Sequence, residues 1–175
     1  MTFVKVLAAL LAAYLVHVVG LSLWAQFPSF IDPFLLVVVW FSMRIGPVGG
    51  ELLGTAAGLL QDWLSSGPFG LSFGLYAFAN TLVGYGVALA AQRVVVGQQA
   101  ARVLIFAAAA GLQQAVLAVL LRSMIADSPM PSIGSVVGKI VSSALLGAAL
   151  ISMESGARTQ WSSWQRRRSR TLRFR

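Results

Sequence analysis

The sequence predicts an all-α, polytopic integral membrane protein that folds as a six-helix transmembrane bundle. The first observation is composition: 58% of the 175 residues are apolar and only 10% are charged, whereas an average soluble domain carries about 25% charged residues. The second is that the apolar residues form six runs, which are separated by turn-forming residues. At about 20 residues per crossing, six crossings leave only short loops and tails. We therefore expect no water-soluble catalytic domain.

Each apolar run is expected to form one crossing. The expected spans are 4–24, 30–46, 48–64, 69–91, 103–125 and 133–153. They form a transmembrane domain over residues 1–156, followed by a basic cytoplasmic tail over 157–175. The second span is the weakest, because its clearly apolar part, Pro33–Met43, would be only about 17 Å long as a helix. It could extend through Phe27 and Phe30, tilt, or be re-entrant, which would leave five crossings.

The distribution of basic residues predicts that both termini are cytoplasmic. In that orientation most lysines and arginines lie on the inner side, including a cluster of arginines in the tail, as the positive-inside rule requires. These tail residues follow directly after an apolar helix, so we expect them to contact anionic lipid headgroups. Binding of nucleic acid or of a protein partner by the tail is the less favoured alternative. The arginines concerned are Arg166, Arg167, Arg168 and Arg170.

The span 48–64 carries two acidic residues, Glu51 and Asp62. Their spacing corresponds to about 1100° of helical rotation, so both should lie on one face, about 16 Å apart along the axis. A charge in the middle of a bilayer costs about 3 kcal/mol, so each carboxylate should have a partner. Asp62 is expected to pair with Lys139 or Arg122. Three arginines could meet Glu51 at the inner end: Arg44, Arg93 and Arg102. Structural pairing is favoured over a proton relay or a contact with a partner helix.

Small residues on the same helix predict close helix packing. Gly50, Gly54 and Gly58 recur every fourth residue, a pattern that lets a neighbouring backbone approach closely. This places span 48–64 at the centre of the bundle and predicts a groove for a partner helix, shared with span 69–91. Asn80 lies within that neighbouring span and is expected to form an interhelical hydrogen bond, worth about 1 kcal/mol. The residues predicted to shape the groove are Gly50, Gly54, Gly58, Asp62, Gly67, Pro68, Gly70, Gly74 and Asn80.

The residue inventory argues against an enzyme, a metal site or a cofactor. The chain has no cysteine and a single histidine, His17, so thiolate sites and multi-histidine metal sites are excluded within one chain. The segment Gly70-Leu71-Ser72-Phe73-Gly74 matches the G-x-S-x-G pattern of serine hydrolases, but that chemistry requires a strand-to-helix turn with a base nearby. Here the serine opens an expected membrane helix. We therefore expect a non-enzymatic protein.

Residues 49–86 resemble the MreD family of bacterial rod shape-determining proteins. The stretch reads GGELLGTAAGLLQDWLSSGPFGLSFGLYAFANTLVGYG. Its matching features are a small-residue helix that ends at Gly58-Leu59-Leu60-Gln61-Asp62, the turn Gly67-Pro68-Phe69-Gly70, and a polar Asn80 in the following helix. Length and helix count agree along nearly the whole chain, including the short second apolar segment after Asp32-Pro33.

The resemblance implies a role rather than a reaction. MreD-like proteins are non-enzymatic inner-membrane members of the rod complex, which dock MreC and act with MreB, RodA and its transpeptidase partner in lateral peptidoglycan synthesis. Their fold is thought to be similar to the membrane subunit of energy-coupling-factor transporters. That similarity supplies the alternative function, a substrate-binding membrane subunit of a vitamin-type transporter. Such a subunit needs a roomy ligand pocket, whereas a scaffold needs a small-residue groove for a single helix.

Overall fold

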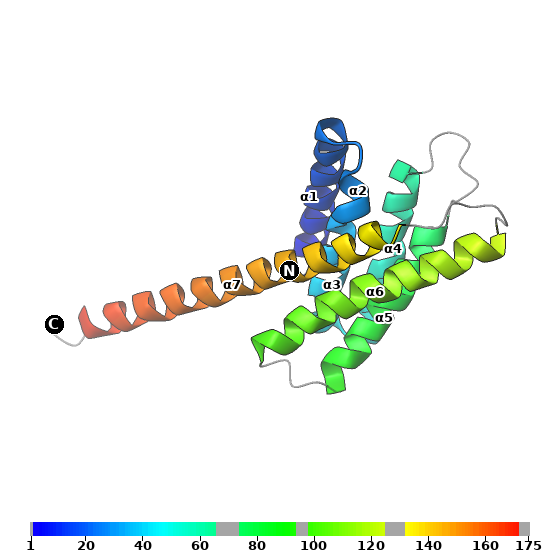
Figure 1. The fold of residues 1–175 in the computed structure, drawn as a ribbon. Helices are drawn as coiled ribbons and strands as arrows, with labels where there is room; N and C mark the ends of the chain where they lie inside the picture. The colour runs from blue at the N-terminus through cyan, green and yellow to red at the C-terminus, as the bar shows by residue number, and fades with distance from the viewer. Residues whose placement is uncertain (1, 66–73, 94–97, 125–131, 172–175) are drawn as a thin grey trace.

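The computed structural model describes residues 2–65, 74–93, 98–124 and 132–171, the last fifteen of these by their backbone only (Figure 1). Apart from short connections, the chain is helical in these ranges and contains no strand. The helices are α1 (Thr2–Leu23), α2 (Phe27–Phe30), α3 (Pro33–Ile45), α4 (Pro47–Ser65), α5 (Leu75–Arg93), α6 (Gln99–Met124) and α7 (Ile133–Thr171).

In the described part of the chain, four helical stretches are long and apolar enough to cross a membrane, which makes this a multi-pass membrane protein. They are Phe3–Leu23, Phe27–Ile45, Gln99–Met124 and Ile133–Gly156. Helices α4 and α5 fall outside this group because glycines and polar residues dilute their apolar content. Part of the fourth expected span, residues 69–73, lies outside the described residues.

The second expected span reaches back to residue 27, so its short apolar part is not the whole of it. The stretch consists of α2 and α3, separated at Ile31 and Asp32. Asp32 is the N-cap of α3, and its Oδ1 accepts a hydrogen bond from the Leu35 N–H at 3.0 Å. Pro33 follows at the first helical position, where its missing N–H costs nothing. Asp32 and Pro33 together therefore start α3.

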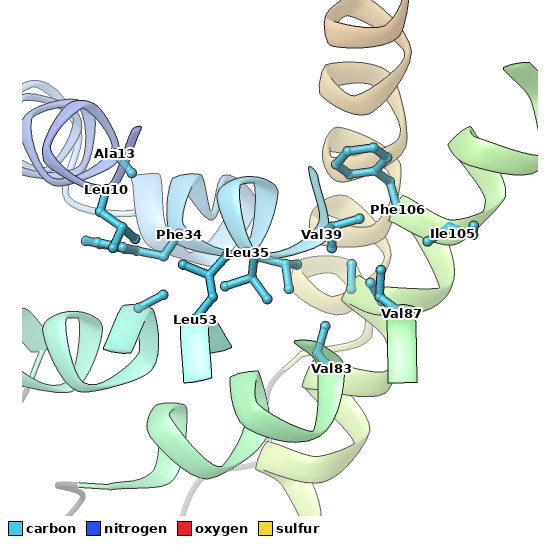
Figure 2. Packing of buried hydrophobic residues seen from close by; sticks show 14 of the residues in the cluster. Leu10, Ala13, Phe34, Leu35, Val39, Leu53, Val83, Val87, Ile105 and Phe106 are labelled. Atoms are coloured by element: carbon cyan, nitrogen blue, oxygen red, sulfur yellow. The ribbon is translucent and has the colours of Figure 1, made fainter. Parts of the chain in front are cut away.

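Helix α3, rather than α4, lies at the centre of the bundle. Phe34, Leu35, Val38 and Val39 on α3 are all fully buried, and α3 packs against α1, α4, α5, α6 and α7. Figure 2 shows Phe34, Leu35 and Val39 among residues of the surrounding helices. The expectation that span 48–64 occupies the centre is wrong, because α4 leaves a whole side exposed, including Trp63. The apolar α3 is better suited to enclosure on all sides.

Helix α7 passes without a break through the expected start of the tail at residue 157. It runs from Ile133 to Thr171 and extends well beyond the other helices (Figure 1). The tail arginines Arg166, Arg167, Arg168 and Arg170 thus belong to this helix. Their side chains lie outside what the structure describes.

Candidate functional site

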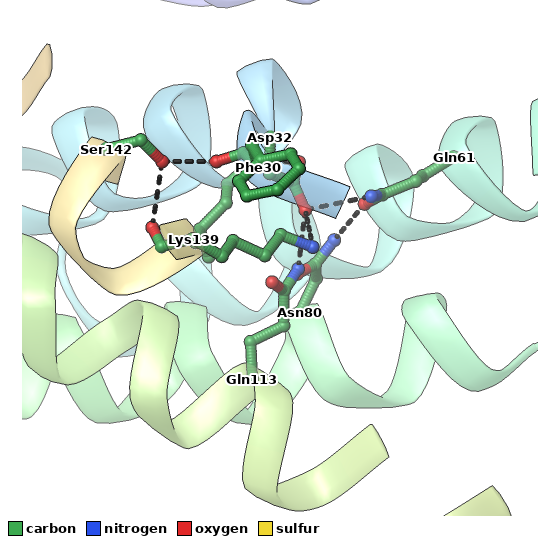
Figure 3. A network of polar contacts seen from close by, with 8 residues as sticks. Phe30, Asp32, Gln61, Asn80, Gln113, Lys139 and Ser142 are labelled. Atoms are coloured by element: carbon green, nitrogen blue, oxygen red, sulfur yellow. Dashed lines mark hydrogen bonds and ion pairs between the residues drawn. The ribbon is translucent and has the colours of Figure 1, made fainter. Parts of the chain in front are cut away.

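A buried polar network around one carboxylate connects five helices of the bundle. Oδ2 of Asp32 on α3 accepts hydrogen bonds from Gln61 Nε2 on α4 at 2.9 Å and from Gln113 Nε2 on α6 at 3.0 Å. Nζ of Lys139 on α7 lies 3.2 Å from the same oxygen. Asn80 on α5 is not hydrogen-bonded to Asp32 but forms hydrogen bonds with both Gln61 and Gln113, as Figure 3 shows. We call these five residues the Asp32 network.

The amide groups of the network form a closed ring whose direction is set by the carboxylate. Because Asp32 can only accept when ionised, Gln61 must present its NH₂ group and keeps its carbonyl for Asn80 Nδ2, 3.1 Å away. Asn80 then presents Oδ1 to Gln113 Nε2 at 2.8 Å. Asn80 thus makes the interhelical hydrogen bonds expected of it. The orientation of each amide is thus fixed by its neighbour in the ring. The complete set of hydrogen bonds forms only when α3, α4, α5 and α6 are arranged in this way.

Burial makes this network a feature of the interior. Asn80 and Gln113 are fully buried, and Asp32 and Lys139 are 2% and 3% exposed. A buried charge without a partner is costly, but Asp32 has four donors, counting the Leu35 N–H. The pair Asp32–Lys139 is neutral overall. The network therefore stabilises the bundle without leaving a net charge inside it.

The predicted pairing of Asp62 with Lys139 is not formed. The carboxylate of Asp62 lies at the start of α5, where it accepts the N–H groups of Gly74, Tyr76 and Ala77 at 3.1, 3.1 and 2.9 Å. These first-turn donors have no partner within their own helix, and the positive end of the helix dipole favours an anion there. Asp62 is thus a cap for α5 supplied from α4. Lys139 is engaged by Asp32 instead.

The other cations expected to pair with Asp62 or Glu51 form no ion pair with these residues either. Arg122 and Arg93 are exposed in the last turns of α6 and α5, and neither forms an ion pair with a residue in the described ranges. Arg44 and Arg102, expected near Glu51, both bind Glu154 on α7.

The cluster around Glu154 holds α3, α6 and α7 together at the opposite end from Asp62. Arg44 Nη2 lies 2.8 Å from Glu154 Oε1, and Arg102 Nη1 lies 3.3 Å from Oε2. The Arg44 guanidinium also lies over the Trp40 ring, with 4.1 Å between its Cζ and the ring centroid, a favourable cation–π arrangement. Glu154 is therefore the carboxylate that meets these cations.

Glu51 is exposed while Asp62 is buried, although both lie on nearly the same helical face. The reason is the ridge formed by Gly50, Gly54, Gly58 and Asp62, which recur at every fourth position. Such a ridge drifts around the helix by about 40° per step. At the level of Glu51 the contact with α5 is centred on Gly50, about 100° away. Farther along α4 the contact with α5 turns around the helix, and it lies on the face that carries both acids only at the level of Asp62.

The predicted partner groove on the glycine face is filled by the protein's own α5. A Cβ atom added at Gly50 would lie 2.5 Å from the carbonyl oxygen of Gly84. Cβ atoms at Gly54 and Gly58 would overlap the backbone of Asn80 and Ala77. The prediction of close approach is therefore correct, but no room remains for another helix. Gly74, at φ 99°, lies directly before α5, and Gly67, Pro68 and Gly70 are outside the described residues.

An apolar groove does exist on the other side of α4. Helix α1 packs on α2 and α3 and leaves between itself and α4 two cavities of about 500 and 290 Å³, which share Leu7 and Leu10. We call this the α1–α4 groove. Its α1 wall consists of Phe3, Val6, Leu7, Leu10, Leu11 and Tyr14, and its α4 wall of Gly49, Leu52, Leu53, Ala56 and Leu60. The walls extend over about 16 Å of α1.

Another, smaller cavity borders the Asp32 network. It has a volume of about 230 Å³ and lies among α2, α5, α6 and α7. Its polar lining residues are Ser29, Tyr76, Gln114, Ser135 and Lys139, and its apolar ones are Pro28, Leu117, Ala118 and Leu121. We call it the Lys139 pocket. Within the described ranges, no three His, Cys, Asp or Glu side chains gather closely enough to hold a metal ion.

Comparison of the chain with protein-family models, with curated proteins and with solved structures gives no significant match.

Proposed function

We propose that this chain is a non-enzymatic scaffold of the bacterial rod complex, which docks MreC in the inner membrane. Through MreC it helps RodA, its transpeptidase partner and MreB to direct lateral peptidoglycan synthesis. The proposal rests on the resemblance of residues 49–86 to the MreD family and on the multi-pass helical fold. The observation that carries it is the α1–α4 groove, an open apolar surface long enough to take about three turns of another helix.

The proposed occupant of the groove is the single transmembrane helix of MreC. Both walls present side chains at the spacing of consecutive helical turns, as in recognition of a helix by a groove. On α4 these are Gly49, Leu52, Leu53 and Ala56. Association of helices in lipid depends on close packing, and Gly49 and Ala56 keep the α4 wall low. Bulkier side chains there would hold a partner helix away.

We further propose six crossings with both termini in the cytoplasm. Apart from the exposed Glu51 near the start of α4, the two helices α4 and α5 turn polar side chains toward each other or toward the Asp32 network, because they contact each other backbone to backbone at their glycines. These side chains are Thr55, Thr81, Gln61 and Asn80. Such shielding lets a helix of modest hydropathy reside in a bilayer. The cluster of Arg44, Arg102 and Glu154 would then lie at the inner surface, which agrees with the positive-inside rule.

Filling the groove tests the proposal. Ala56→Phe places a ring in the α1–α4 groove and should reduce co-purification of MreC from native membranes by about tenfold or more, the effect of losing about 1.4 kcal/mol. Ala115→Phe makes the same change on an exposed apolar face of α6 and should leave co-purification unchanged. Equal recovery of MreC with both variants would refute the groove.

Cross-linking gives an independent test, since the chain has no cysteine of its own. A cysteine at Leu7, in the groove, should form a disulfide with a cysteine in the MreC helix. A cysteine at Val119, exposed on α6, should not. The opposite pattern would place MreC on the other side of the bundle.

The alternative function, a substrate-binding subunit of a vitamin-type transporter, is favoured by the Lys139 pocket alone. Its volume of about 230 Å³ is below the range of about 300–1,000 Å³ typical of small-molecule sites. Retention of a vitamin by the purified protein, together with co-purification of an ATPase in place of MreC, would favour transport.

A further inference from the structure

The ammonium group of Lys139 has more hydrogen-bond capacity than the described residues use. A lysine carries three N–H donors, and among the described side chains the one acceptor within reach is Asp32 Oδ2, at 3.2 Å. The residue is only 3% exposed, and leaving buried donors without an acceptor is costly. Lys139 lines the pocket, whereas Asp32 does not. An acceptor in the pocket would satisfy the remaining donors.

Asp32 does not depend on Lys139 alone for its stabilisation. Three neutral donors also reach its carboxylate: the Leu35 N–H, Gln61 Nε2 and Gln113 Nε2. These hydrogen bonds remain when the ammonium group shares its charge with a second anion. The ion pair can therefore extend into a triad of anion, ammonium and carboxylate, with the new anion on the pocket side.

The lining of the pocket suits an amphiphile. Tyr76, Ser29 and Gln114 add neutral hydrogen-bonding groups beside Lys139, and the Lys139 Nζ lies 5.7 Å from the centre of the Tyr76 ring. On α6, Leu117 and Leu121 provide an apolar strip next to Gln114. A purely ionic ligand would leave this strip uncovered, and a purely apolar one would leave the donors unmet.

We propose that the Lys139 pocket binds the phosphodiester headgroup of an anionic phospholipid, with Lys139 as its counter-charge. Phosphodiester oxygens accept hydrogen bonds from Lys139 and from the neighbouring hydroxyl and amide groups, while the glycerol and the start of the acyl chains cover Leu117 and Leu121. This site is separate from the arginine tail, and it does not depend on the docking of MreC.

The test compares lipid binding by matched variants of the full-length protein in detergent. Phosphatidylglycerol is titrated and lipid-bound protein is counted by native mass spectrometry, with phosphatidylcholine as the zwitterionic comparison of zero net charge. Leu121→Trp fills the pocket and should weaken the tightest phosphatidylglycerol binding by about tenfold. Val119→Trp adds the same ring on the exposed face of α6 and should leave that binding unchanged. Tyr76→Phe should weaken it by a few-fold, because one hydroxyl donor is lost.

The outcomes separate lipid from soluble ligands. Glycerol 3-phosphate is added as a soluble competitor that carries the same phosphate chemistry without acyl chains. No displacement at millimolar concentration, together with the loss in Leu121→Trp, supports the lipid. Displacement by glycerol 3-phosphate overturns the lipid as ligand and assigns the pocket to a soluble phosphate ester. Equal binding of phosphatidylglycerol by Leu121→Trp and Val119→Trp overturns the site itself.

Discussion

Nζ of Lys139 lies 3.2 Å from Oδ2 of Asp32, and the two residues come from α7 and α3, more than a hundred positions apart in sequence. Both are almost fully buried. The pair therefore fixes α7 to the central helix by an interaction that needs both partners to be present. Removal of either one leaves a buried charge without its counter-charge, which is costly.

The first prediction concerns this pair. Lys139→Gln should lower the free energy of unfolding by about 3 kcal/mol. Asp32→Asn should cost a similar amount even though asparagine remains a good N-cap for α3. The double variant should lose less than the sum, because no charge is then left unpaired. Unfolding in mixed detergent measures all three, and strictly additive losses would contradict the coupling.

The second prediction concerns the contact between α4 and α5. Gly54→Ala should destabilise the fold by about 1–3 kcal/mol, the usual cost of overpacking, because the new methyl group would collide with the Asn80 carbonyl. Gly86→Ala on α5 is the matched control, since its Cβ would meet Leu112 at an ordinary 3.9 Å. Thermal unfolding in detergent distinguishes them. Equal melting temperatures would show that the two helices are farther apart.

The third prediction separates capping from ion pairing at Asp62. Asp62→Ala should cost about 1–2 kcal/mol, as the loss of an N-cap does, because the Tyr76 and Ala77 N–H groups lose their acceptor. Hydrogen exchange at these two amides should rise with the loss of stability. Asp62→Lys combined with Lys139→Asp should be no better than Asp62→Lys alone. Rescue by the charge swap would restore the pairing expected from sequence.

The fourth prediction concerns the path through the membrane. Single cysteines at Ser65 and Gln98, which flank α5, are both exposed and can be labelled with a membrane-impermeant maleimide. With six crossings, Ser65→Cys should react from outside and Gln98→Cys only after permeabilisation. Ser132→Cys, beyond α6, should again react from outside. Reaction of Ser65→Cys and Gln98→Cys from the same side would mean that α5 does not cross.

The sequence predicts the helices better than it predicts their neighbours. Runs of apolar residues locate the spans, and the spacing of Gly50, Gly54 and Gly58 indicates a close helix contact, which is present. Position along a helix defines a face but not the helix that meets it. For this reason the glycine face could be assigned to a partner protein, although α5 of the same chain occupies it.

The partner of Lys139 was missed for a related physical reason. The Asp32-Pro33 pair has the ordinary signature of a helix start, so nothing in its local pattern marks Asp32 as the centre of a network. Its neighbours Gln61 and Gln113 come from helices that meet only in the folded bundle. The sequence does indicate that a buried hydrogen-bond network exists, because five polar side chains within apolar spans need hydrogen-bond partners. Their pairing depends on the tertiary arrangement.

The backbone contact between α4 and α5 has a consequence for biogenesis. Helix α4 exposes glycine carbonyls and the Asp62 carboxylate until α5 covers them, and hydrocarbon offers no water to do so instead. Synthesis proceeds from α4 to α5, so α4 lacks the neighbour that covers this face until α5 has been made. If α4 and α5 cross the membrane as proposed, we therefore expect them to enter the lipid together as a hairpin, and a chain truncated between them to insert less efficiently.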